Sequence, residues 1–199
     1  GPRHSCVANT LNNMAGIYQV QGKLTLALET YEEALSIMKE TLGPRHSSVA
    51  STLNNMAIVY EEKGHLDLAL KTYEEALGIK KEILGPRHSS VADTLNNMAN
   101  VYDEQDKLEL ALETYEEALG IYKETLGLRH SSVAGTLNNM GEVYRLQENL
   151  DLALETYEEA LAIKKETLGP RHSSVANTLG NMASVYKKQG KLDLALEMY

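Results

Sequence analysis

Residues 43–84 read GPRHSSVASTLNNMAIVYEEKGHLDLALKTYEEALGIKKEIL, and this stretch decides the fold because the chain repeats it. Its opening Gly-Pro-Arg-His recurs at positions 1, 85 and 169, with Gly-Leu-Arg-His at 127. The period of 42 residues gives full units 1–42, 43–84, 85–126 and 127–168 and a partial unit 169–199. A fixed period of this size is typical of repeat proteins whose units stack on their neighbours. We therefore expect a single continuous domain over residues 1–199.

The first half of each unit carries the apolar spacing of an amphipathic helix. In the quoted stretch, Leu53, Met56 and Tyr60 fall at i, i+3 and i+7, which places them on one helical face. This pattern predicts a first helix, helix A, over residues 48–62. Serine stands at the position of Ser47 in every unit, so we expect its hydroxyl group to cap the first turn.

The second half of each unit predicts a longer helix. Lys63-Gly64-His65 supplies a turn, because glycine adopts positive φ without strain. Apolar residues then continue with helical spacing, which predicts helix B over residues 66–84. Gly85 and Pro86 end it, since glycine closes helix C-termini and proline cannot continue a helix. The expected fold is all-α, a right-handed superhelical solenoid of antiparallel helix pairs.

The pattern of large and small residues resembles the tetratricopeptide repeat signature. The residues that carry the resemblance in the quoted stretch are Leu53, Met56, Ala57, Tyr60, Gly64, Leu66, Ala69, Tyr73 and Ala76. The usual repeat of that family has about 34 residues, and the longer unit found here is similar to the repeats of kinesin light chains. The resemblance implies a scaffold that binds partner proteins in a concave groove lined by helices A.

Composition and charge exclude several classes of protein. The formal net charge is −9, which argues against nucleic-acid binding because phosphate neutralisation needs a basic face. No apolar run is long enough for a membrane span. The single cysteine, Cys6, cannot form an internal disulfide bond, so we expect a cytoplasmic protein.

Repeated polar residues in the loops do not predict an active site. Histidine and arginine recur once per unit, as in Arg45-His46, and one repeat-width separates each copy from the next, too far to share a metal ion. We expect each histidine to hydrogen-bond a neighbouring helix end and each arginine to pair with a Glu-Glu of helix B, such as Glu74-Glu75. The sequence therefore predicts no catalytic residue, no metal site, no cofactor and no enzyme activity.

Residues that vary between units fall on one face of helix A, away from its apolar stripe. By resemblance to tetratricopeptide proteins, that face lines the peptide-binding groove. Asparagine amides on the same face both donate and accept, so they suit a peptide backbone; alternatively they bond each other or water. The candidate peptide-binding residues are Asn12, Asn54, Asn96, Asn138, Ser51, Asp93, Ile58, Asn100, Glu142, Glu61, Asp103, Arg145 and Lys187.

Two functions remain open at this point. The first is a non-enzymatic scaffold that binds an extended or helical segment of a partner protein, with a preference for basic peptides because the middle of the groove is acidic. The second is a structural array that stacks head to tail and has no specific peptide ligand. Near-identical units favour the second, because a groove adapted to one peptide is expected to diversify. For the second, we expect the apolar stub 192–199 to meet the exposed first helix A of another copy.

Overall fold

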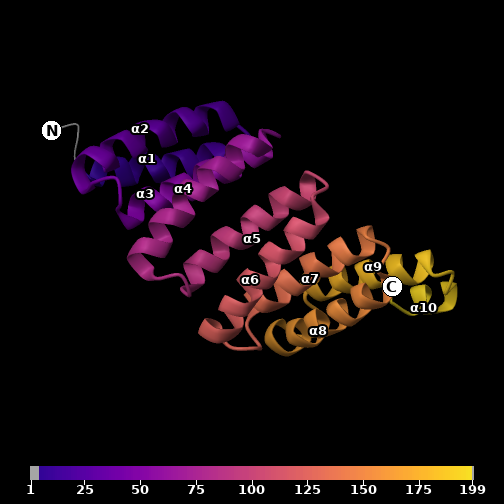
Figure 1. Cartoon of the computed structure of the whole chain (residues 1–199). Coiled ribbons are helices and arrows are strands. Elements are labelled where there is room, and N and C mark those ends of the chain that lie inside the picture. The colour runs from indigo at the N-terminus through magenta and orange to yellow at the C-terminus, as the bar shows by residue number, and fades with distance from the viewer. Residues whose placement is uncertain (1–4, 199) are drawn as a thin grey trace. The chain divides into compact units, whose positions relative to one another are not determined.

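The computed structural model describes residues 5–198, and all of their regular structure is helical (Figure 1). Helices make up 84% of these residues. The helices A are α1 (Ser5–Val20), α3 (Ser47–Glu62), α5 (Ser89–Glu104), α7 (Ser131–Leu146) and α9 (Ser173–Lys188). The helices B are α2 (Leu24–Leu42), α4 (Leu66–Leu84), α6 (Leu108–Leu126), α8 (Leu150–Leu168) and α10 (Leu192–Met198). The all-α prediction of paired helices is confirmed.

The helices group into two compact units, residues 1–101 and 102–199. In the first unit α1 packs on α2, α2 on α3 and α3 on α4. In the second, each helix from α6 to α10 packs on the next. Helices A of successive repeats also touch directly, α1 with α3 and α7 with α9. Neighbouring helices A therefore lie side by side within each unit.

A histidine caps each described internal helix A. The Nδ1 atom of His46 accepts a hydrogen bond of 3.1 Å from the backbone N–H of Ser48, and the same bond recurs at His88, His130 and His172. The prediction that loop histidines bond a helix end is confirmed there, whereas the prediction of Ser47 as the cap is wrong. His46 has extended backbone angles and its imidazole reaches the second helical residue, so helix A begins one residue earlier than expected. His4 lies outside the described residues.

The turn between helices A and B needs a left-handed residue. Gly64 takes φ of 73°, and its N–H donates to the carbonyl oxygen of Glu61 at 2.7 Å, which closes the end of helix A. In the next two repeats this position holds Asp106 and Glu148, with φ of 59° and 64°. These two residues adopt the left-handed conformation at a steric cost that glycine avoids.

Alanine and tyrosine build the core of each helix pair. In the first unit, Ala15, Ala27 and Tyr31 pack with Met56 and Val59 of the following helix A. Alanine allows the helices to approach closely, and the tyrosine ring fills the space that remains. Tyr73, Tyr115 and Tyr157 occupy the matching positions and are 0–1% exposed.

The loop arginines pair with a different glutamate from the one expected. Arg45 forms an ion pair of 3.0 Å with Glu82, which lies in the last turn of helix B and not in its Glu-Glu pair. Arg129 pairs with Glu166 in the same way, at 3.3 Å. The predicted partner Glu75 bonds Lys39 instead, at 2.9 Å. Arg45 follows the C-terminal end of α2, so its side chain reaches the C-terminal end of the next helix B, α4.

Candidate functional site

Three of the predicted groove asparagines each form a hydrogen bond with a threonine of the following repeat. The side-chain oxygens of Asn12, Asn54 and Asn138 accept from the hydroxyl groups of Thr52, Thr94 and Thr178, at 3.0, 3.2 and 2.8 Å. The threonines are 0–1% exposed and the asparagines half-buried. Each bond joins two helices A across 40 positions. Sequence reasoning missed the threonines, although their presence in all five units was a signal.

Lysines extend this link in two repeats, Lys80 being buried and Lys164 half-buried. The ammonium group of Lys164 donates to Asn138 Oδ1 at 3.1 Å and to Thr178 Oγ1 at 2.8 Å. Lys80 donates to Thr94 Oγ1 at 2.7 Å and to the carbonyl oxygen of Ser90 at 3.1 Å. Burial lowers the pKa of both lysines, and nearby Asp93 opposes this for Lys80.

The lysine fixes the orientation of the asparagine beside it. An ammonium group only donates, so the atom of Asn138 that faces Lys164 is the amide oxygen. The amide nitrogen of Asn138 is then directed away from the junction between the repeats. The half-buried side chain can therefore offer two N–H donors to a ligand on the face of helix A.

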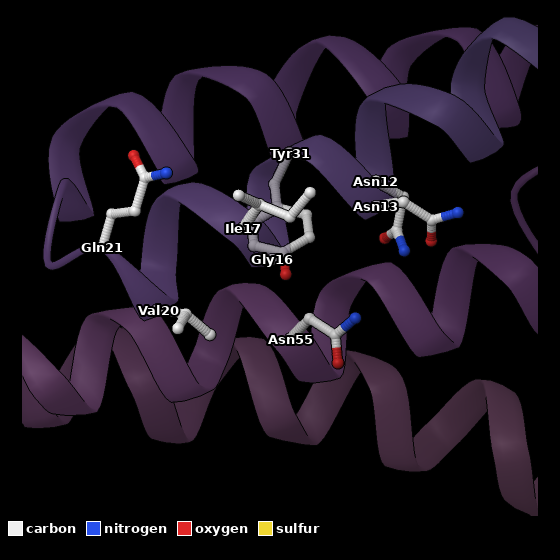
Figure 2. A pocket seen from close by; sticks show the side chains of 8 residues that line it. All are labelled: Asn12, Asn13, Gly16, Ile17, Val20, Gln21, Tyr31 and Asn55. Atoms are coloured by element: carbon white, nitrogen blue, oxygen red, sulfur yellow. The ribbon is translucent and has the colours of Figure 1, made fainter.

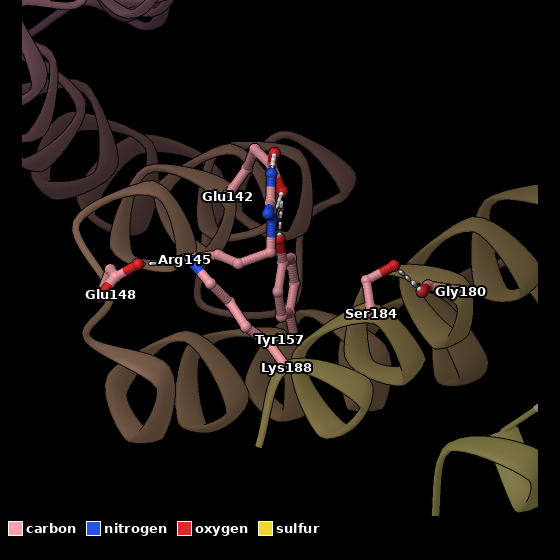
Figure 3. A network of polar contacts seen from close by, with 7 residues as sticks. All are labelled: Glu142, Arg145, Glu148, Tyr157, Gly180, Ser184 and Lys188. Carbon is pink, nitrogen blue, oxygen red and sulfur yellow. Dashed lines mark hydrogen bonds and ion pairs between the residues drawn. The ribbon is translucent and has the colours of Figure 1, made fainter. Parts of the chain in front are cut away.

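Figure 3 shows that Glu142, another predicted groove residue, bonds the tyrosine of its own repeat. The hydroxyl group of Tyr157 donates to Glu142 Oε2 at 3.0 Å, and Arg145 Nε donates to the same oxygen at 2.8 Å. Arg145 lowers the pKa of the Glu142 carboxyl, while burial raises the pKa of Tyr157 above its usual value. In repeat two, Tyr73 donates in the same way to Glu61, at 3.0 Å.

A glycine allows the close approach of Tyr157 to α7. Gly141 stands where the other units have alanine, and a Cβ atom added there would lie 2.7 Å from Cε1 of the Tyr157 ring. Since carbon atoms do not pack at that distance, the ring occupies the space that an alanine would fill. From this position in the fourth repeat, the Tyr157 hydroxyl group donates to Glu142.

Asp103 is the predicted groove residue with the least favourable surroundings. Its Oδ1 atom is buried and has no hydrogen-bond partner among residues 5–198. Burial and the negative charges of Glu142, Glu104 and Asp106 raise its pKa, and Arg145 lowers it. The remaining candidates divide by exposure: Asn96, Ile58 and Asn100 are half-buried, whereas Ser51, Asp93 and Lys187 are exposed.

A cleft of about 550 Å³ opens between α1 and α3 in the first repeat (Figure 2). Its lining residues are Asn12, Asn13, Gly16, Ile17, Val20, Gln21, Tyr31 and Asn55. Asn12 is the one of them named as a candidate peptide-binding residue, while Gly16 and Val20 stand at positions that vary between units on the same predicted face. At the position of Gly16 the other units carry a side chain.

The sequence pattern of the tetratricopeptide repeat matches residues 6–82, 66–124 and 132–199. The chain belongs to the tetratricopeptide repeat family. Among solved structures, BtubC (BKLC) from P. vanneervenii is 27% identical, with a TM-score of 0.85 over 98% of this chain and 77% of that one. A putative kinesin light chain with nearly identical repeats from Podosopora anserina is 24% identical, with a TM-score of 0.81 over 98% and 92%. No curated protein is similar enough in sequence to count as a relative.

In the part of this tetratricopeptide chain that the structure describes there is neither a membrane-spanning helix nor a cluster of metal ligands. No helix among residues 5–198 combines the length and apolar character needed to cross a membrane. Nor do three His, Cys, Asp or Glu side chains gather there closely enough to hold a metal ion.

Proposed function

We propose that this protein is a non-enzymatic scaffold that holds an extended or helical segment of a partner protein along the shared face of its helices A. Tetratricopeptide repeats generally mediate protein–protein interactions. The observation that carries the proposal is the asparagine–threonine link, because it sets asparagine amides at one register on neighbouring helices A. The single cysteine, Cys6, fits a location in the cytoplasm, where thiols stay reduced.

Charge selects among partner segments. In the first unit Glu61 and Asp93 give this face an acidic character, whereas in the second unit Asp103 and Glu142 stand beside the basic residues Arg145 and Lys187. Opposite charges steer association and fix register. Basic segments should therefore bind better than acidic ones, and added salt should weaken the binding of the basic segments.

The test compares two variants that break the same hydrogen bond. Asn138→Ala removes the bond and the amide that faces a ligand, whereas Thr178→Val removes only the bond. The probe is the tightest-binding peptide selected from a library of extended peptides against the whole chain. We expect Asn138→Ala to weaken that peptide about 3- to 10-fold, and Thr178→Val to change its affinity less than about 2-fold. Equal losses would make the asparagines purely structural and overturn the proposal.

A second candidate function is head-to-tail self-association. Val7, Met14 and Ile17 of α1 are 37–58% exposed, whereas the matching residues of internal repeats are buried against the preceding helix B. At the other end, Leu192 and Leu196 of α10 are 59% and 72% exposed. The two surfaces correspond to those that meet at every internal junction, so one copy can continue the packing of another.

Sedimentation at increasing concentration tests this second function. We expect weak, concentration-dependent association that Leu192→Glu plus Leu196→Glu abolishes. The control, Leu68→Glu plus Leu152→Glu, places the same charges on exposed leucines that are 48% and 47% accessible in internal helices B. A chain that stays monomeric at high concentration, or equal behaviour of the two variants, would remove self-association as a function.

A further inference from the structure

The hydroxyl group of Tyr31 differs from those of its counterparts. Tyr73 and Tyr157 each donate to a glutamate carboxylate at 3.0 Å. Tyr31 is only 2% exposed, yet its hydroxyl group has no hydrogen-bond partner among residues 5–198. The oxygen is not one of the sealed polar atoms without a partner among residues 5–198, because it opens onto the cleft that Tyr31 lines. The first repeat therefore holds a donor that is open to a ligand at the position where other repeats hold one bonded to a glutamate.

Two substitutions of the first repeat explain the missing partner. Gly16 replaces the residue that is Glu142 in the fourth repeat, and Gln19 replaces the residue that is Glu61 in the second. The Gln19 amide donates instead to Glu62 Oε1, at 2.8 Å. Figure 2 shows the Tyr31 hydroxyl oxygen beside Gly16, in the space between the two helices.

The space left by Gly16 reaches the hydroxyl group. A Cβ atom placed on Gly16 would lie 3.5 Å from Tyr31 Oη, with no other atom within 4 Å apart from its chain neighbours and the adjoining backbone of α1. This space is part of the 550 Å³ cleft described above. A ligand atom that enters where the other repeats carry a side chain would therefore meet the open donor.

The lining of the cleft sets the chemistry of that ligand. Tyr31 needs an acceptor, which excludes an ammonium group. The cleft offers no cationic side chain to balance a carboxylate. Burial raises the pKa of Tyr31, and the negative charge of Glu62 raises it further. The surrounding amides of Asn13 and Asn55 can pair with a group that donates as well as accepts. Ile17 supplies an apolar wall that is 58% exposed.

We propose that this cleft binds the carboxamide side chain of a glutamine or asparagine in the partner segment. The carboxamide oxygen accepts from Tyr31, its NH₂ group donates to a neighbouring amide oxygen, and its methylene groups pack against Ile17. The proposal rests on the scaffold function, because the cleft lies on the same face as Asn12, and it names the side chain that the first repeat selects.

The direct test uses butyramide, which has the atoms of a glutamine side chain from Cα outward. Binding to the whole chain is followed by the methyl NMR signal of Ile17. We expect a saturable shift with a dissociation constant on the order of 10 mM, as for a very small ligand. Butyrate, which has nearly the same shape and a negative charge, should bind about 10-fold more weakly. Equal or tighter binding of butyrate, or no shift with butyramide, would overturn the proposal.

Matched variants separate the cleft from the rest of the face. Gly16→Asn fills the cleft with the residue that the third repeat has as Asn100, so the fold accommodates it, and it should abolish the shift. Ser184→Asn makes the same replacement at the matching position of the fifth repeat and should leave the shift unchanged. Tyr31→Phe should remove the preference for butyramide over butyrate, whereas Tyr73→Phe should keep it. A shift that survives Gly16→Asn would place the ligand elsewhere and overturn the proposal.

The two proposals fail in distinguishable ways. Loss of butyramide binding while Asn138→Ala still weakens the selected peptide more than Thr178→Val would overturn only the carboxamide site. Equal effects of Asn138→Ala and Thr178→Val would overturn the scaffold function, whatever butyramide does.

Discussion

The hydroxyl group of Thr178 donates to the side-chain oxygen of Asn138 at 2.8 Å, across 40 positions of the sequence. Thr178 is fully buried and the two residues lie on consecutive helices A. A hydrogen bond between repeats has an orientation as well as an energy, so it fixes the register of one helix A on the next. Apolar packing alone defines that register less sharply.

The energy of this bond can be measured with a double-mutant cycle of Thr178→Val and Asn138→Ala. Each single variant should lower the free energy of unfolding by about 0.5–1.5 kcal/mol, because each removes one hydrogen bond while the remaining partner keeps another, Asn138 with Lys164 or Thr178 with the Ser174 carbonyl oxygen. The coupling energy should be about 0.5–1.5 kcal/mol. Chemical denaturation measures all four proteins, and additive losses would show that the bond contributes nothing.

Lys80 and Lys164 predict a stabilising replacement. Met38 stands at the position of Lys80 and Lys164 in the first repeat, where Thr52 bonds Asn12 without any lysine. Lys80→Met plus Lys164→Met should therefore leave the free energy of unfolding unchanged or raise it by about 1–2 kcal/mol. Lys80→Ala should instead lower it by about 2 kcal/mol, since it leaves a cavity.

The two lysines also predict how the stability gained by the double methionine variant depends on pH. Their pKa values are lower in the folded chain, so protonation favours the unfolded chain and its cost is present in full below the folded pKa. The cost disappears as the pH rises from the folded pKa to the unfolded value of about 10.4. The advantage of the double methionine variant should therefore shrink in alkaline solution. An advantage independent of pH would contradict the role given to the charges.

Asp103→Asn should stabilise the protein at neutral pH. The folded chain raises the pKa of this carboxyl, so its charged form destabilises the fold above that pKa and the cost disappears as the pH falls. Removing the charge should raise the free energy of unfolding by up to about 1 kcal/mol at pH 7, with no gain in strong acid. Thermal unfolding across that pH range measures the effect.

Glu142→Gln provides the opposite control. Arg145 and Tyr157 lower the pKa of Glu142, so its charge stabilises the fold above its unfolded pKa, and that stability is lost as the pH falls through the folded pKa. Glu142→Gln should therefore destabilise the protein at pH 7 and have little effect in strong acid. The same sign for both variants at pH 7 would contradict this assignment of the two carboxyl groups.

The turn between α5 and α6 predicts a third stabilising change. Asp106 has φ of 59° where three other repeats have glycine, so Asp106→Gly relieves the left-handed strain. The free energy of unfolding should rise by about 0.5–1 kcal/mol. Asp106→Ala, which retains a Cβ atom in that conformation, should not stabilise, and equal effects of the two would show that strain at this turn is absent.

The sequence by itself determined the helices of this protein. The period of 42 residues, the apolar spacing and the glycines at the turns predicted helix B over 66–84, which is its observed extent. The predicted start of helix A, residue 48, was one residue too late, because His46 and not Ser47 caps the helix. These features depend on neighbours within a few residues, so local propensity and periodicity are enough to find them.

The tertiary structure alone decided which polar groups meet and which remain unsatisfied. Asn138, Lys164 and Thr178 stand 26 and 14 positions apart and form one network only because three helices pack together. The same packing gives Tyr157 a carboxylate and leaves Tyr31 with none. Repeats with nearly the same sequence thus acquire different sites, because a hydrogen bond requires atoms to meet within about 3 Å, and distances between helices at that scale are set by packing.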